Sequence, residues 1–268
     1  MTRDMTSTTA RAEIEHGYGS RVHILNDAFL LTLLARIGHP NTSSRELRGL
    51  LRSIYQRLLG SALAAELPTV DARVPTRMSS ETDRGHYEGP IIDPGTEVVI
   101  ACLVRAGVLP SEICYETLIE VVDPGGVRLD YLSMSRQVDE RGCVVGTDES
   151  GLKIGGPLRD KILLIPDPMG ATGGTVRRVL DIYEERDLGP AQKTIVVPMI
   201  ATPEFLRSLA ENHPRVIVYT GRLDRGMSSP EVLARTPGTV EGEHGLDERQ
   251  YIVPGAGGIG EVLTNSWV

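Results

Sequence analysis

Apolar residues gather along the chain in short continuous runs that alternate with stretches of helical spacing. The runs predict β-strands at Glu97–Val104, Val127–Ser133, Ile162–Ile165, Lys193–Ile200 and Val216–Thr220. The helical spacings predict α-helices at Pro110–Val122, Val176–Glu185 and Pro203–Asn212. Strands that alternate with helices favour a parallel α/β sheet, in which ligands bind beyond the carboxyl ends of the strands. The loops that follow the strands are therefore the expected place for the chemistry.

Other stretches lie outside this alternation. After Ser43, a candidate N-cap, apolar residues as far as Leu58 share one helical face, which predicts a packing helix. The stretch Pro68–Gly95 is polar and irregular, so we expect no regular element there. The segment 136–156 is long, polar and rich in glycine, as lids and disordered loops commonly are. The segment 225–249 also breaks the rhythm.

The loop after the strand Ile162–Ile165 is the most informative. Asp167 stands where the strand ends, and the small residues 170–175, Gly-Ala-Thr-Gly-Gly-Thr, lead into a helix. Free backbone N–H groups and the positive end of the helix dipole meet at such a helix start and attract an anion. A phosphate is the expected guest, and Asp167 beside it suits the hydroxyls of a sugar that carries the phosphate. An ordinary glycine-rich turn is the alternative, which the order of acid, loop and helix disfavours.

Composition narrows the function classes. With 268 residues and 40% hydrophobic content, the chain can bury the core of one domain. The net charge of −8 argues against nucleic-acid binding but allows a local basic pocket for a small polyanion. The three cysteines, Cys102, Cys114 and Cys143, follow no metal spacing and indicate reduced thiols, with Cys102 in the core.

Residues 1–20 are polar and lack the apolar segment of a signal peptide, and we expect them to be disordered. No apolar run approaches the length of a membrane span. We therefore expect a cytoplasmic protein that has no membrane partner.

Three motifs carry a resemblance to a known family. Asp167-Pro168-Met169 followed by Ala171-Thr172-Gly173-Gly174-Thr175 resembles the 5-phosphoribosyl-1-pyrophosphate (PRPP) motif of type I phosphoribosyltransferases, in the version of the uracil phosphoribosyltransferase family. Tyr251-Ile252-Val253-Pro254-Gly255 resembles that family's uracil-binding segment, and Val104-Arg105-Ala106-Gly107 resembles its pyrophosphate loop. The motifs stand in the family's order, and the resemblance covers residues 20–268.

The resemblance implies the architecture of a type I phosphoribosyltransferase. We expect one domain over 1–268, with a parallel sheet flanked by helices, a small hood formed by the N- and C-terminal segments, and a flexible arm at 136–156 that closes over PRPP. Arg136 matches the arginine of that arm, and a solvated loop arginine is the alternative. The segment 225–249 is an insertion relative to the family pattern. A homodimer or a larger homo-oligomer is also implied.

The resemblance further implies transfer of a phosphoribosyl group from PRPP to a pyrimidine-like base, with uracil as the default base and UMP and pyrophosphate as the products. The loop from Ala171 to Thr175 would hold the 5′-phosphate, and Asp167 would hold the ribose hydroxyls and favour developing positive charge on the sugar. Arg105, with the backbone of Ala106 and Gly107, would take the pyrophosphate, because its fork pairs two phosphate oxygens. A Mg²⁺ ion would be held mainly by PRPP and water, without dedicated protein ligands.

The base would bind along Tyr251, Ile252, Gly257 and Gly258. The N–H and C=O of Ile252 and the N–H of Gly257 would read its edge. Backbone groups offer a donor and acceptor pattern without charge, which suits a flat neutral ring. A structural turn is the alternative for this segment.

The chain departs from the family pattern after this segment. Where the family has a Gly-Asp step and then a second Gly-Asp followed by a basic residue, this chain has Gly257-Gly258 and then Gly260-Glu261-Val262. Three hypotheses follow: a uracil enzyme in which Glu261 or water substitutes for the missing acid, a transferase with another uracil-like acceptor in specialised nucleoside metabolism, or a non-catalytic PRPP- or nucleotide-binding regulatory protein.

Overall fold

The computed structural model describes residues 12–138 and 144–266. In this part of the chain, a seven-stranded sheet forms the centre, in the order β1-β11-β9-β7-β4-β5-β6. All neighbouring strands in it are parallel except β5 and β6, which are antiparallel. Its strands are β1 (Val22–Ile24), β4 (Val98–Val104), β5 (Val127–Val138), β6 (Val144–Lys153), β7 (Ile162–Ile165), β9 (Lys193–Val196) and β11 (Ile217–Thr220). The predicted parallel α/β sheet is confirmed.

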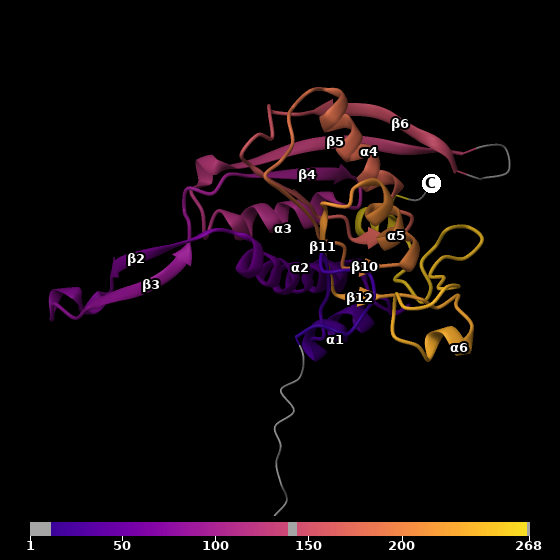
Figure 1. Ribbon diagram of the computed structural model, residues 1–268, viewed down its shortest axis with the longest axis horizontal. Helices are drawn as coiled ribbons and strands as arrows, with labels where there is room; N and C mark the ends of the chain where they lie inside the picture. The colour runs from indigo at the N-terminus through magenta and orange to yellow at the C-terminus, as the bar shows by residue number, and fades with distance from the viewer. Residues whose placement is uncertain (1–11, 139–143, 267–268) are drawn as a thin grey trace, which may run out of the picture.

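Helices cover both faces of the sheet (Figure 1). Alternate residues of β4 enter two separate cores: Val98 and Ile100 face one, and Val99 and Ala101 face the other. The first core is closed by α1 (Ala28–Ile37), α2 (Ser44–Glu66), α3 (Val108–Leu118) and α7 (Ile259–Thr264). The second is closed by α4 (Gly174–Glu185) and α5 (Pro203–Asn212). Burial on both faces explains why these strands are continuous apolar runs.

The predicted helices are present, with α2 longer than its apolar stripe suggested. It begins with a capping box between Ser43 and Glu46. The predicted strand Lys193–Ile200 is interrupted: β9 ends at Val196, and a second strand, β10 (Ile200–Ala201), follows Pro198. The strand β10 lies in a small parallel sheet between β12 (Arg222–Leu223) and β8 (Met169–Gly170).

The expectation of irregular structure at Pro68–Gly95 is wrong. The strands β2 (Thr69–Pro75) and β3 (His86–Ile92) form an antiparallel hairpin that extends away from the body of the protein (Figure 1). The short 3₁₀ helix η1 (Arg77–Ser80) lies in the turn that joins them, and a second one, η2 (Pro124–Gly126), precedes β5. Most hairpin residues are exposed, so no apolar alternation marked its strands.

The predicted arm 136–156 is largely an antiparallel ribbon, because β5 continues past the sheet and pairs with β6. Arg136 lies on β5, opposite Thr147. The tip at 139–143, which includes Cys143, lies outside the described residues. Cys102 and Cys114 are free and buried.

The N-terminal stretch and the segment 225–249 pack together. Residues 1–11 lie outside the described residues. The expected disorder is wrong for residues 12–20, which are ordered: Glu13 pairs with Leu25, and the Tyr18 hydroxyl donates to the buried Glu243 at 2.6 Å. The segment 225–249 contains one short helix, α6 (Pro230–Leu233). Among the described residues, no helix is both long enough and apolar enough to cross a membrane.

Candidate active site

Two of the three motifs leave the sheet at the same edge. The strands β4 and β7 are parallel neighbours, with Ile100 opposite Leu164. Arg105 follows β4 directly, and Asp167 follows β7 after a single proline. Parallel strands end at one edge, so these two loops open toward the same side of the sheet. The structure thus brings together the predicted pyrophosphate loop and the predicted phosphate loop.

Hydrogen bonds from Thr202 hold the phosphate loop in place. The Thr202 N–H donates to the Gly170 carbonyl at 3.0 Å, and the Thr202 hydroxyl donates to the Ala171 carbonyl at 2.6 Å. A Cβ at Gly170 would press on Pro198 at 3.1 Å and on Phe205 at 3.2 Å. These contacts fix the path of the chain into α4.

Gly173 makes the turn into the helix. Its φ of +80° is a left-handed conformation, which glycine adopts without steric cost. The Thr172 hydroxyl oxygen accepts from the Gly174 N–H at 3.3 Å, and no side chain of the N-cap residue Gly173 caps α4. The first-turn N–H groups beyond Gly174 and the positive end of the helix dipole therefore meet beside the exposed Gly174, where an anion is favoured.

Asp167 is half-buried at the start of this loop. One of its carboxylate oxygens accepts from the Met169 N–H at 3.3 Å, which orients the side chain within the turn. A carboxylate fixed in this way stands one loop away from the anion cradle. The predicted role of Asp167 toward a sugar stays a prediction.

The pyrophosphate loop is equally tight. The Val104–Arg105 peptide bond is cis, and the Gly107 N–H donates to the Leu103 carbonyl at 2.9 Å. A Cβ at Gly107 would approach that carbonyl oxygen at 2.7 Å, so only glycine fits there without a backbone shift. Arg105 keeps 38% of its side chain exposed. Its guanidinium donates to the carbonyl of Ser266 at 3.0 Å and lies 3.6 Å from a carboxylate oxygen of Glu261.

The third motif reaches the same place through α7. A Cβ at Gly260 would lie 3.3 Å from the Cβ of Ala106, so the start of α7 packs directly on the pyrophosphate loop. The Glu261–Arg105 contact joins the same two elements. The helix that follows the third motif therefore contacts the pyrophosphate loop.

The predicted base-reading groups are available in the described structure. Ile252 forms an antiparallel bridge with Leu246, and the hydrogen bonds of that bridge are made by the neighbours Val253 and Tyr251. In such an antiparallel pair the N–H and C=O of Ile252 itself point away from the strand of Leu246. Gly257 is exposed with φ of +69°, whereas Gly255 is buried with φ of +62°. The side chain of Tyr251 is 56% exposed.

Glu261 occupies the space above Gly258. A Cβ built on Gly258 would collide with the Glu261 carboxylate, so that carboxylate lies where a side chain at position 258 would begin. Arg105 stands on its other side. An acid is thus present at this junction although position 258 is glycine.

Two residues beside the base segment were missed by the sequence reasoning. The carboxylate of Asp224 accepts from the Gly255 N–H at 2.8 Å, and Arg222 donates to the Gly255 carbonyl at 3.0 Å. An arginine and an acid two residues apart at the end of a strand were the available signal.

The part of the site that the structure describes contains no preformed metal cage. Within the described residues, no group of three or more His, Cys, Asp or Glu side chains could hold a metal ion. Cys102 does not supply a thiolate, because burial raises the pKa of its thiol above the usual range. Charge here comes from Arg105, Asp167 and Glu261.

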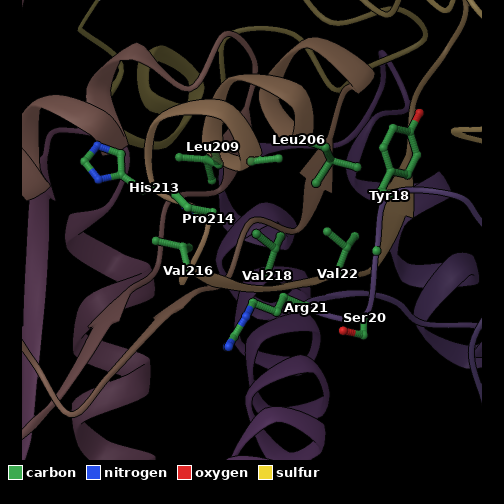
Figure 2. Close-up of a pocket in the computed structure, with 12 residues that line it drawn as sticks. Tyr18, Ser20, Arg21, Val22, Leu206, Leu209, His213, Pro214, Val216 and Val218 are labelled. Carbon is green, nitrogen blue, oxygen red and sulfur yellow. The ribbon is translucent and has the colours of Figure 1, made fainter.

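The motifs do not line the pocket at the β1 edge of the sheet, which is partly open to solvent. That pocket, of about 240 Å³, is lined by α5, by β11 and by the residues around β1 (Figure 2). Its walls are chiefly apolar, with Leu206, Leu209 and Val218 among them. No predicted site residue contributes to it, so the candidate site is separate from this pocket.

Comparisons with known proteins point to one family. A family model described as uracil phosphoribosyltransferase matches residues 24–240, a range that includes both strand-exit loops. Two proteins named uracil phosphoribosyltransferase, from Burkholderia mallei (strain SAVP1) and Burkholderia thailandensis, are each 28% identical over 240 residues, which is 90% of this chain and 93% of theirs. The solved structure of the AQ2163 protein from Aquifex aeolicus is 22% identical and matches with a TM-score of 0.68 over 92% of this chain and 99% of that one.

Proposed function

The chain belongs to the uracil phosphoribosyltransferase family and is a phosphoribosyltransferase, and we propose that it transfers the phosphoribosyl group of PRPP to the ring nitrogen of uracil, which yields UMP and pyrophosphate. The observation that carries the proposal is the placement of the three motifs. The pyrophosphate loop and the phosphate loop leave neighbouring parallel strands at one edge of the sheet. The helix α7, which follows the base segment, reaches the pyrophosphate loop, because Gly260 packs on Ala106 and Glu261 lies beside Arg105.

PRPP would lie across the two strand-exit loops. The N–H groups at the start of α4 would bind its 5′-phosphate, as the open helix terminus and the left-handed Gly173 favour. Asp167 would bind the ribose hydroxyls and stabilise the positive charge that develops on the sugar as the leaving group departs. Arg105, with the backbone of Ala106 and Gly107, would bind the pyrophosphate, which requires the guanidinium to exchange its contact with Ser266 for phosphate oxygens.

The base would bind against the segment 251–258. The outward N–H and C=O of Ile252 provide one donor and one acceptor, and the N–H of the exposed Gly257 provides a second donor. This pattern complements the alternating acceptor and donor groups of a neutral uracil edge. Tyr251 would flank the ring, and Gly258 leaves room beside it.

A Mg²⁺ ion would enter this site bound to the substrate rather than to protein ligands. The described residues form no three-ligand cluster, so the ion would be held mainly by PRPP oxygens and water. When bound, it supplies positive charge that neutralises the pyrophosphate. Glu261 would stand beside it, between Arg105 and the base segment.

A second acceptor class deserves a direct comparison because position 258 carries no side chain. The space beside the base is instead bounded by the Glu261 carboxylate. A uracil-like heterocycle with an additional hydrogen-bond donor on that side would gain a partner that uracil lacks. Transfer to such a base is the second candidate function.

We further propose that the protein acts as a homodimer or a larger homo-oligomer in the cytoplasm. The hairpin β2–β3 supports the first part, because a two-stranded hairpin that projects into water is marginally stable on its own. It exposes the apolar side chains of Val70, Val74 and Tyr87. Sedimentation of the unaltered protein tests this proposal, which a monomer at all concentrations would exclude.

The test of the proposed function is UMP formation and pyrophosphate release from PRPP, Mg²⁺ and uracil. Asp167→Asn is the control, and it should lower kcat at least about 100-fold with an unchanged melting temperature. Uracil-dependent release that Asp167→Asn abolishes supports the proposal. Release with other uracil-like bases and not with uracil would support the second candidate. Absence of release with any base would refute both.

A further inference from the structure

A buried ion pair lies directly behind the base segment. Asp224, at the end of β12, has only 2% of its surface exposed. Arg222 binds it through two parallel hydrogen bonds, with Nε at 2.6 Å from Oδ1 and Nη2 at 2.8 Å from Oδ2. Such bidentate charge-assisted pairs combine strength with a fixed geometry. Side chains paired in this way are suited to hold a backbone segment in place.

The pair grips both polar groups of Gly255. The N–H of Gly255 donates to Oδ2 of Asp224 at 2.8 Å, and the carbonyl of Gly255 accepts from Nη2 of Arg222 at 3.0 Å. Gly255 itself is buried, and a Cβ there would collide with the carbonyl oxygen of Ile252. The loop is therefore clamped at its middle, where its backbone path admits little variation.

Gly255 stands midway between the proposed reading points of the base. Ile252 precedes it by three residues and Gly257 follows it by two, and neither of their outward groups is held by the clamp itself. The flank before Gly255 is supported separately, because the Gly226 N–H donates to the Val253 carbonyl at 2.9 Å. The spacing from Ile252 to Gly257 thus depends on where Gly255 is fixed.

We propose that the Arg222–Asp224 pair is a positioning element for base recognition: it holds Gly255 so that Ile252 and Gly257 face one base edge. This inference rests on the proposed function, since it assumes that the segment 251–258 reads the base. The side-chain hydrogen bonds of the pair run between its two members, to Gly255 and to the carbonyl of Leu34. Its loss should therefore weaken binding of the base and spare binding of PRPP.

The chain contains a matched control pair with the same local sequence. Arg128-Leu129-Asp130 repeats the Arg-Leu-Asp of residues 222–224. Arg128 also binds its acid through two bonds, at 3.0 and 3.1 Å, and Asp130 also accepts from a glycine N–H, that of Gly155 at 2.9 Å. Asp130 is fully buried. This pair lies at the base of the β5–β6 ribbon and makes no contact with the base segment.

The experiment compares Arg222→Met with Arg128→Met. Each removes one guanidinium of similar burial and leaves one acid without its ion-pair partner, so both should lower the melting temperature. Arg222→Met should also raise the KM for uracil about tenfold or more, the scale expected for loss of a charge-assisted hydrogen bond. The KM for PRPP should stay within about twofold. Arg128→Met should leave the KM for uracil unchanged.

Asp224→Asn is the second variant, used if Arg222→Met does not fold. It keeps the shape and an acceptor oxygen, so it should raise the KM for uracil less than Arg222→Met would. An unchanged KM for uracil in a folded Arg222→Met or Asp224→Asn protein would overturn the inference. An equal rise in the KM for uracil and for PRPP would also overturn it, because the pair would then be only a structural support.

Amide hydrogen exchange separates this inference from the proposed function. In the unaltered protein the Gly255 amide, which donates to Asp224, should exchange slowly, and Arg222→Met should accelerate its exchange while Arg128→Met does not. If the unaltered protein shows no transfer to any base, the proposed function fails, and the exchange result still decides whether the pair holds the loop. Equal exchange in all three proteins would refute the clamp whatever the activity.

Discussion

The adjacent glycines of the phosphate loop allow stability and binding to be separated by two single-methyl changes. Gly173→Ala places a Cβ on a residue with φ of +80°, at 3.1 Å from the hydroxyl oxygen of Ser208. A left-handed conformation costs a non-glycine residue about 1–2 kcal/mol. For a domain of this size each kcal/mol lowers the melting temperature by about 2–4 °C, so we expect a fall of about 2–8 °C.

Gly174→Ala should behave in the opposite way. Its Cβ would meet the Thr172 hydroxyl oxygen at 3.5 Å, an ordinary contact, and alanine favours helix over glycine. The melting temperature should therefore stay the same or rise. However, a Cβ in a helix points toward the helix N-terminus, which at this exposed position is the proposed phosphate site. Crowding the N–H groups that bind a charged phosphate should weaken PRPP binding about tenfold or more.

Thermal unfolding and calorimetric titration with PRPP and Mg²⁺ measure the two effects. The account predicts that Gly173→Ala loses stability, and that Gly174→Ala loses PRPP affinity with full stability. Full PRPP affinity in Gly174→Ala would refute placement of the phosphate at the start of α4. An unchanged melting temperature in Gly173→Ala would refute the argument from its backbone conformation.

Further predictions concern the acid beside the base, the stability at low pH and the arm. Glu261→Ala should lower kcat about tenfold or more, whereas adding Gly258→Asp to that variant should recover activity, because removal of the Glu261 carboxylate vacates the space that a side chain at position 258 needs; no recovery would argue against a role for an acid there. Burial opposes ionisation of Glu66, but hydrogen bonds from Lys193 and Tyr219 outweigh it and hold the pKa of Glu66 below its ordinary value of 4.5. This stabilisation is therefore complete above about pH 4.5 and is lost as the pH falls through the lowered pKa, so the melting-temperature deficit of Glu66→Gln should shrink below pH 4.5; a deficit independent of pH would contradict this. Replacement of Arg136 should raise the KM for PRPP and leave thermal unfolding unchanged, and an unaltered KM would make it a surface residue.

Elements that are buried in the core were predictable from the sequence, because burial requires a recognisable apolar pattern. The strands at Val98–Val104 and Ile162–Ile165 were predictable because both faces are covered, which demands continuous apolar residues. The helix α1 carries the usual signals, with Asp27 as N-cap and Leu30, Leu33, Leu34 and Ile37 buried, yet it was not predicted. The hairpin β2–β3 gave no such pattern, since it buries neither face against the body.

The site divides in the same way. Local features such as the acid, the glycine turn and the helix start are contiguous along the chain, so the amino-acid sequence alone predicts the phosphate loop. The contact of Asp224 with Gly255 spans 31 residues and depends on how the intervening segment folds. Likewise, the placement of the Glu261 carboxylate above Gly258 follows from the first turn of α7. Sequence motifs predicted the candidate site residues, whereas the residues that contact and support them were visible only in the tertiary structure.

The most direct test of the central claim, that three separate loops form one nucleotide site, is a crystal structure of the protein with UMP. The account predicts the phosphate at the first turn of α4, the ribose hydroxyls at Asp167, and the uracil edge at the backbone of Ile252 and Gly257. UMP bound with its base away from the segment 251–258, or with its phosphate away from α4, would contradict the account.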